Sequence, residues 1–328
     1  MKNIVVREAK TNDKVSILSL LNEVFGDQQE SEFVRDESYW NWKFEKNVFG
    51  RPIVSVAECE GKIVAVSNLW PWSFNARNTT INALQACDSA VHKDYRGYGL
   101  FKKTRLHGVH QSQKLNYDFI FNFPNKQSFP FYKKYGWHYF GLIPWKIKII
   151  KPANVFRDKW GESKSSFFDI PLQYKLDTEE IDRLYEPITY DSFIKTCYVK
   201  GYSEWRYKNK PGRNYGMVSY ADGSKQTIAI FTINQKKYSR ELIIVDILGH
   251  KGNTILLFKK VIEISKDLKI DLIAVMDNPL YATKRLWKLG FMNKSLKNFV
   301  VLPLNLNIEQ KIMDFASWSL MAGMHDSI

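Results

Sequence analysis

Four residues, Arg96-Gly97-Tyr98-Gly99, have the composition of a loop that binds phosphate. They follow a strand-like stretch, Ala86 to Val91, and precede a helix that begins near Leu100. Glycine tolerates positive φ, so two glycines before a helix allow a tight turn with several N–H groups pointing outward. The helix N-terminus adds roughly half a positive charge, and each charge-assisted N–H bond to a phosphate contributes on the order of 1.5–3 kcal/mol. The pattern predicts an anion site that suits a diphosphate.

A second stretch whose residues could take part in catalysis, Asn125 to Trp137, lies a little further along the chain. It places Tyr132 among other aromatic residues, four positions before Gly136. A phenol with a pKa near 10 can donate a proton at neutral pH. On a helix, Tyr132 could equally be a core aromatic residue, and Asn125 could be a helix N-cap.

The two stretches, in this order and spacing, resemble the signatures of the GNAT superfamily of acyl-CoA N-acyltransferases. One departure is Phe101, which stands where the family usually has a small residue. The resemblance implies acetyl-CoA as co-substrate, Tyr132 as proton donor to the departing thiolate, and Asn125 as a partner of the pantetheine arm. It also implies main-chain N–H groups around Ala90 and Val91 that polarise the thioester oxygen. The residues expected to hold the diphosphate are Arg96, Gly97, Tyr98, Gly99 and Leu100.

In this family an amine attacks the thioester directly, so the amine must first lose a proton. An amine of pKa about 10.4 is neutral only a few parts in ten thousand at pH 7, whereas one near 8 costs about 1.4 kcal/mol to deprotonate. Asp88 is the candidate base, directly or through a water, provided that burial raises its pKa. Alternatively, Asp88 orients a substrate or satisfies a backbone group. Glu58 and Asp326 are weaker candidates.

The composition sets further bounds on function. The chain has 328 residues, of which 45% are hydrophobic, and a net charge of +14, which favours an anionic partner such as coenzyme A. Its three cysteines show no metal-ligand spacing, so we expect reduced core cysteines, no metal and a cytoplasmic protein. No membrane span or signal peptide is indicated, and no nucleic-acid module is recognisable.

The elements that must position the site can be followed in order. A strand at Ile4 to Glu8 precedes an amphipathic helix that ends at Gly26. Pro52 to Glu60 and Ile63 to Trp70 form a hairpin, and Asp118 to Phe123 is a buried strand. Four tryptophans could either line an acceptor pocket or pack in the core: Trp40, Trp42, Trp70 and Trp72.

The second half of the chain repeats the first. Trp205-Arg206-Tyr207 matches Trp42-Lys43-Phe44, and Asp246 matches Asp88. The second copy lacks the arginine and the paired glycines, and it has Leu286 in the place of Tyr132. We therefore assign the chemistry to the first copy.

These observations predict an α/β (α+β) protein of two tandem GNAT-like domains, each a mixed, mostly antiparallel sheet flanked by helices. The expected divisions are a catalytic domain at 1–150, a linker at 151–186, a degenerate domain at 187–305 and a C-terminal helix and tail at 306–328. Within the tail, Ile308 to Met321 is expected to be a docking helix.

The predicted function is acetyl transfer from acetyl-CoA to a primary amine of a small molecule, including an amino sugar or a nucleotide-linked amine. Two alternatives remain at this point. One is an aminoacyl-tRNA-dependent peptidyl transferase of the same doubled fold, which needs no diphosphate loop. The other is a non-catalytic regulator that binds acyl-CoA.

Overall fold

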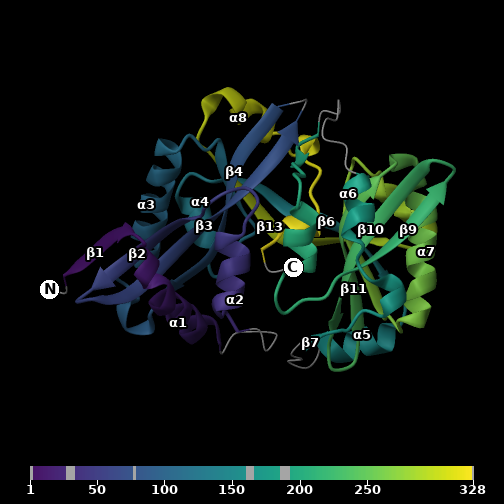
Figure 1. The fold of residues 1–328 in the computed structure, drawn as a ribbon, viewed down its shortest axis with the longest axis horizontal. Coiled ribbons are helices and arrows are strands. Elements are labelled where there is room, and N and C mark those ends of the chain that lie inside the picture. Colours follow the sequence, from purple (N-terminus) through teal and green to yellow (C-terminus); the bar gives the residue numbers. More distant parts are fainter. Residues whose placement is uncertain (1–2, 27–33, 77–78, 160–165, 185–192, 327–328) are drawn as a thin grey trace. The chain divides into compact units, whose positions relative to one another are not determined.

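The structure is a computed structural model that describes residues 3–26, 34–76, 79–159, 166–184 and 193–326. The chain forms two compact units. Unit 1 comprises residues 1–74, 80–141 and 298–314, and unit 2 comprises residues 75–79, 142–297 and 315–328. Figure 1 shows the helices and strands of each unit.

The sheet of unit 1 has the strand order β1-β2-β3-β4-β5-β13. Its strands are β1 (Ile4–Glu8), β2 (Ile53–Cys59), β3 (Lys62–Ala76), β4 (Thr79–Val91), β5 (Phe119–Asn122) and the end of β13 (Met292–Pro303). Strands β1 to β3 are antiparallel neighbours, whereas β4 and β5 are parallel. The expected hairpin is confirmed, with a turn at Glu60 and Gly61. The mixed, mostly antiparallel sheet agrees with the predicted fold class.

Helices flank this sheet. They are α1 (Lys14–Phe25), α2 (Glu37–Trp40), α3 (Leu100–Lys114), α4 (Phe129–Lys134) and α8 (Leu306–Ile312). Helix α1 ends at the predicted Gly26. Helix α3 packs on β1 and β2, and it connects the parallel strands β4 and β5 (Figure 1). Parallel strands require such a crossover, so the start of α3 lies at the carboxyl end of β4.

Unit 2 repeats this arrangement. Its sheet has the order β6-β12-β11-β10-β7, with β9 also paired to β10. Strand β11 pairs in parallel with β12, and α7 connects them as α3 connects β4 and β5. The elements of unit 2 are β6 (His138–Ile149), α5 (Pro152–Lys159), β7 (Ser166–Phe167), α6 (Thr178–Arg183), β8 (Lys195–Thr196), β9 (Gly216–Asp222), β10 (Lys225–Gln235), β11 (Arg240–Gly249), α7 (Thr254–Asp267) and β12 (Leu272–Met276).

The boundaries of the units differ from the expected domain limits. Residues 142–150 join unit 2 because Trp145–Ile149 of β6 pair with β12. In exchange, Val300–Pro303 of β13 pair with β5 and complete the sheet of unit 1. The described part of the expected linker, 151–186, carries α5, β7 and α6 rather than irregular chain, and residues 160–165 and 185–186 lie outside the described residues.

The tail also differs from its prediction. Its helix α8 ends at Ile312 rather than continuing to Met321. Residues Trp318 to Met324 are instead buried in unit 2 without forming an α-helix. Since these residues are almost all apolar or small, burial favours their packing whatever the backbone conformation.

The three cysteines lie in the described part of the chain and form no disulfide there, and Cys59 and Cys87 are buried as expected. None of the helices in the described part of the chain has the length and apolar composition that a bilayer crossing requires.

Candidate functional site

The predicted diphosphate loop forms a sharp turn at the N-terminus of α3. Gly97 and Gly99 have φ values of 86° and 70°, in the left-handed region that favours glycine. The residues from Arg96 to Gly99 are exposed, whereas Leu100 is buried at 1% exposure beside Val64 and Ala65. Leu100 therefore anchors the start of the helix while the turn before it faces solvent.

This turn has the properties of an anion site. The first N–H groups of α3 have no carbonyl partner within the helix, and the helix dipole adds positive charge to them. The side chain of Arg96 adds a full charge. Phe101, the departure from the family pattern, packs edge-on against Phe131 of α4 with ring centroids 4.9 Å apart. Phe101 thus packs against α4 at the start of α3 and does not fill the turn.

Strands β4 and β5 separate beside this loop. Their parallel pairing ends at Gln85 and Phe121, although β4 continues to Val91. Ala90 is buried and Val91 is partly exposed in this last part of β4. A main chain that has left its parallel neighbour can offer N–H groups to an extended ligand. The geometry fits the insertion of a pantetheine arm between the strands.

Tyr132 lies in α4 at 2% exposure. Its Oη accepts a hydrogen bond of 2.7 Å from Nδ2 of Asn122, the last residue of β5. Since the amide donates, this bond does not use the phenolic hydrogen. The ring also packs edge-on against Trp137, so its core role and its proposed role are compatible.

Asn125 caps the turn before α4. Its Oδ1 accepts hydrogen bonds from the main-chain N–H and the hydroxyl of Ser128, at 2.9 and 3.0 Å. Asn125 therefore stabilises this turn, whereas the N-cap of α4 itself is Ser128. Contact of Asn125 with a pantetheine arm stays a prediction.

Asp88 lies at the centre of a buried ion cluster. Its carboxylate accepts from Nζ of Lys43 at 2.6 Å, Oη of Tyr39 at 2.6 Å and Nε of Arg35 at 3.1 Å. Burial alone would raise the pKa of Asp88, but the charges of Lys43 and Arg35 outweigh burial and hold the pKa well below its usual range. A carboxylate held in this way is a poor proton acceptor, which weakens the expectation that Asp88 is the base.

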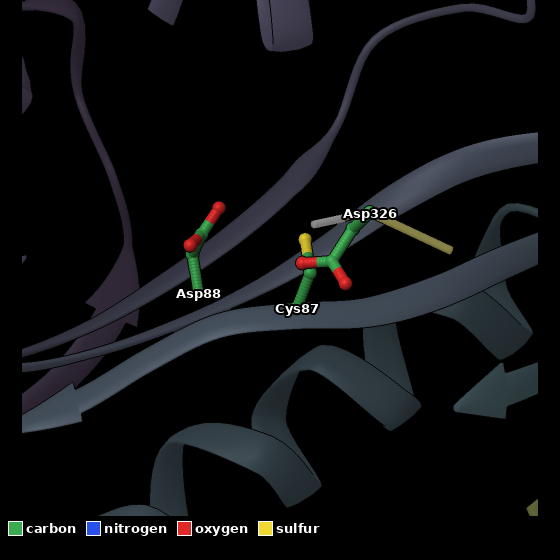
Figure 2. Close-up of side chains that lie close together, drawn as sticks. All are labelled: Cys87, Asp88 and Asp326. Carbon is green, nitrogen blue, oxygen red and sulfur yellow. The ribbon is translucent and has the colours of Figure 1, made fainter. Parts of the chain in front are cut away.

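The backbone at Asp88 is also unusual. Its φ is 35°, and the Asn68 amide donates to the Asp88 carbonyl oxygen at 2.8 Å. Consecutive side chains of a regular strand point to opposite faces, but Cys87 and Asp88 rise on the same side of β4 (Figure 2). The turned backbone therefore directs the Asp88 carboxylate toward the side chain of Lys43 rather than toward a backbone group. The other candidate in unit 1, Glu58, is bound by Arg7 at 2.6 and 2.8 Å.

Sequence reasoning did not identify Gln85. This residue is fully buried at the position where β4 and β5 separate, and neither amide atom has a hydrogen-bond partner among the described residues. An unsatisfied buried polar group costs about 1–3 kcal/mol, so a polar ligand or a water at Gln85 would be stabilising. The four tryptophans, by contrast, are all buried, as the packing alternative expected.

Unit 2 lacks these features at the matching positions. After His250, the 3-10 helix Lys251–Asn253 leads into α7, and it carries one glycine, Gly252, and no arginine. Leu286 is buried at 0% exposure where the first copy has Tyr132. The carboxylate survives, however, and burial raises the pKa of Asp246 from 3.8 to about 6 although Tyr198 and Tyr207 donate hydrogen bonds to it.

Comparisons with known proteins agree with this geometry. Residues 5–140 match the family described as acetyltransferase (GNAT) domain. Over these residues the chain is similar to GNAT acetyltransferases. A search of curated protein sequences finds no match. The GNAT match supports acyl-CoA-dependent N-acyltransferase activity in general terms.

Solved structures show the same fold at low sequence identity. A GCN5-related N-acetyltransferase from Anabaena variabilis is 14% identical with a TM-score of 0.62, over 93% of this chain and 74% of its own. A probable N-acyltransferase from Enterococcus faecalis is 14% identical with a TM-score of 0.66, over 93% and 74%. Saccharomyces cerevisiae N-myristoyltransferase with bound myristoyl-CoA is 11% identical with a TM-score of 0.57, over 92% and 83%. The GNAT fold therefore extends beyond the matched domain into both copies.

The glycine turn can be tested without altering any side-chain contact. A Cβ at Gly97 or Gly99 meets nothing within 4 Å, so alanine acts only through the positive φ. A left-handed alanine costs about 1–2 kcal/mol, and we expect Gly97→Ala and Gly99→Ala to weaken acetyl-CoA binding about 5- to 30-fold by calorimetry. The matched control is Gly26→Ala, which also enters open space but at a φ of −56°. Unchanged affinity in both loop variants would remove the turn from the binding site.

The two matched carboxylates should respond to pH in opposite directions. Asp246 has a raised pKa, so between pH 3.8 and about 6 the folded chain retains a proton that the unfolded chain releases. Stability therefore falls as pH rises through this window, by about 3 kcal/mol. We expect Asp246→Asn to gain that amount relative to wild type between pH 4 and pH 7 in chemical denaturation.

Asp88 provides the contrast. Its lowered pKa stabilises the folded chain above the unfolded value of 3.8, and this contribution is lost as pH falls. Asp88→Asn leaves Lys43 buried without its counter-charge, so we expect a loss of about 3–5 kcal/mol at pH 7. Parallel pH profiles for the two variants would show that the environments of the two carboxylates are equivalent.

Proposed function

We propose that the N-terminal domain transfers an acetyl group from acetyl-CoA to the primary amine of a small molecule. The observation that carries this proposal is the exposed glycine turn at the start of α3, next to the separated ends of β4 and β5. These features offer a diphosphate site and an extended slot at the same end of the sheet. The match to the GNAT family over residues 5–140 supports the reaction class.

In this proposal the main-chain N–H groups from Gly97 to Leu100, together with Arg96, hold the diphosphate. The N–H groups of Ala90 and Val91 polarise the thioester carbonyl, because a donor fixed before the reaction costs no reorganisation as negative charge develops. Asn125 lies in the turn before α4 and contacts the pantetheine arm with its amide. The unsatisfied amide of Gln85 binds a polar group of the substrates or an ordered water.

Tyr132 then protonates the departing thiolate. The Asn122 amide fixes the position of the phenolic oxygen, so the hydroxyl hydrogen can point toward a thiolate formed between β4 and β5. General acids of this kind contribute typically 10²- to 10⁴-fold to rate.

The state of Asp88 restricts the acceptor. With Asp88 neutralised by Lys43 and Arg35, and Glu58 bound by Arg7, the two candidate bases of unit 1 are engaged with cations. An acceptor amine of pKa near 8 loses its proton to water at a cost of about 1.4 kcal/mol at pH 7 and needs little help. We therefore favour an acceptor such as an amino sugar or a nucleotide-linked amine over a lysine-like amine.

The two alternative functions, a peptidyl transferase and a non-catalytic regulator, differ from the proposed enzyme in what they require. A peptidyl transferase that uses aminoacyl-tRNA needs no diphosphate loop. This alternative therefore does not explain the exposed turn of Gly97 and Gly99. A regulator would bind acetyl-CoA without releasing free thiol in the presence of amines.

The role of Tyr132 is tested by Tyr132→Phe. We expect kcat to fall 10²- to 10⁴-fold with little change in acetyl-CoA affinity, because only the proton donor is lost. Thiol release under saturating substrates is the measurement, with the folded fraction checked because the Asn122 amide loses an acceptor. Tyr135→Phe, one residue past the end of the same helix, is the matched control. Equal turnover in the two variants would assign Tyr132 to packing alone.

The restriction on the acceptor is tested by pH profiles over a panel of amines. If the enzyme supplies no base, log kcat/KM should rise with unit slope up to the pKa of each amine and then level off. The inflection should therefore move with the amine. An inflection at one fixed pH for every amine would show that an enzyme group takes the proton.

A further inference from the structure

The degenerate copy contains a cavity of its own. A space of about 80 Å³ lies at the end of β11 in unit 2. Its lining includes Asp246, Tyr198, Tyr281, Ser319, Met321 and Met324. For comparison, an apolar cavity of about 150 Å³ holds a benzene molecule. The space in unit 2 therefore suits a group of a few non-hydrogen atoms.

The carboxylate in this cavity is buried but not saturated. Asp246 is 4% exposed and accepts three hydrogen bonds, from Tyr198 and Tyr207 at Oδ2 and from the Ile247 N–H at Oδ1. A carboxylate has about four acceptor positions, so Oδ1 retains capacity for one more donor. Burial raises the pKa of Asp246 to about 6, which still leaves the group ionised at pH 7.5.

The first copy shows what is missing here. Its matching carboxylate, Asp88, is held by the Lys43 ammonium at 2.6 Å. Lys43 lies on the π-helix Asn41–Glu45, and the matching π-helix Glu204–Lys208 of unit 2 carries Arg206. In both copies a buried cation is therefore available at the same place in the sequence.

In unit 2 that cation lies near enough for its charge to lower the pKa of Asp246, but it forms hydrogen bonds with the backbone of the tail. The Arg206 guanidinium donates to the carbonyl oxygens of Gly323 and His325, both at 2.8 Å. Lys195 and Lys251 also line the cavity, and no ion pair between either of them and Asp246 is found among the described residues. The Asp246 carboxylate is thus bound by phenols and an amide, where its counterpart is bound by an ammonium group.

We propose that this cavity binds the ammonium end of a small organic amine. The ammonium group would donate to Asp246 Oδ1 and lie against the tyrosine rings, while Leu280, Met321 and Met324 contact the attached carbon atoms. The site gives the second copy a ligand, and it does not depend on the acetyl transfer proposed for the N-terminal domain.

The test uses n-propylammonium and its uncharged isostere n-propanol at pH 7.5, on the full chain. Two of the seven methionines, Met321 and Met324, line the cavity, so methyl NMR of ¹³C-methionine-labelled protein reports local binding. We expect n-propylammonium to shift both resonances with a dissociation constant in the millimolar range, and n-propanol to bind at least tenfold more weakly. Equal effects of the two probes, or no effect of either, would overturn the proposal on wild-type protein alone.

Two variants separate this site from the proposed enzyme. Asp246→Asn keeps the shape of the cavity and should weaken n-propylammonium binding at least tenfold. Arg96→Ala removes a charge from the diphosphate loop and should leave the methionine shifts unchanged while it weakens acetyl-CoA binding. Full amine binding in Asp246→Asn would overturn the proposal, and so would loss of amine binding in Arg96→Ala. Failure of wild-type protein to bind acetyl-CoA would count against the proposed function only.

Discussion

The parallel pairing of β4 with β5 is the constraint on which the candidate site depends. Two parallel strands cannot be joined by a tight turn, so the chain must cross over through α3, and the N-terminus of α3 must lie at the carboxyl end of β4. The pairing covers only three residues of each strand before the strands separate. The glycine turn, the end of β4 and the Asn122–Tyr132 pair therefore come to one end of the sheet. The same constraint acts on β11, α7 and β12, where the pairing also ends before the carboxylate at Asp246.

The two copies solve one electrostatic problem in different ways. A buried carboxylate must be paired, hydrogen-bonded or protonated, because desolvation of a bare charge is expensive. In the first copy two cations neutralise Asp88, and its pKa is low. In the second copy the phenols of Tyr198 and Tyr207 replace the cations, and burial dominates the pKa of Asp246. The pKa values of these two phenols are raised well above 10, by burial and by the adjacent carboxylate, so they remain donors.

Much of the fold could be predicted from the sequence because its signals are local. The hairpin, the first helix and the glycine turn each depend on residues within one element, and the repeat revealed the doubled fold. Features set by distant contacts were not predicted. The partners of Asp88 lie 45 to 53 positions earlier in the sequence, and nothing in their own neighbourhoods marks them as partners. The repeat did carry one signal, since Lys43 and Arg206 are cations at matching positions of the two copies.

The same reason explains the unit boundaries and the tail. The exchange of strand partners by β6 and β13 is a property of long-range pairing, and periodicity within a strand cannot reveal it. The tail combines helical spacing with apolar residues. Its apolar residues are buried, but its helix ends at Ile312, earlier than the spacing predicts. Gln85 gave no sequence signal because its importance comes from its buried amide, which has no hydrogen-bond partner in the described part of the chain.

The second copy lacks the glycine turn but keeps the buried carboxylate, and the two differ in their effect on stability. In the first copy Arg96 to Gly99 are exposed and add nothing to the core, whereas Leu257 and Phe258 of α7, which match Leu100 and Phe101, are fully buried. A copy that no longer binds diphosphate can therefore lose its turn at little cost in stability, provided that it keeps the packing of the helix behind it. Asp246 is different, because an ionised carboxylate in its place reduces stability at neutral pH. A side chain that destabilises the fold and borders a cavity is better explained by a ligand than by packing.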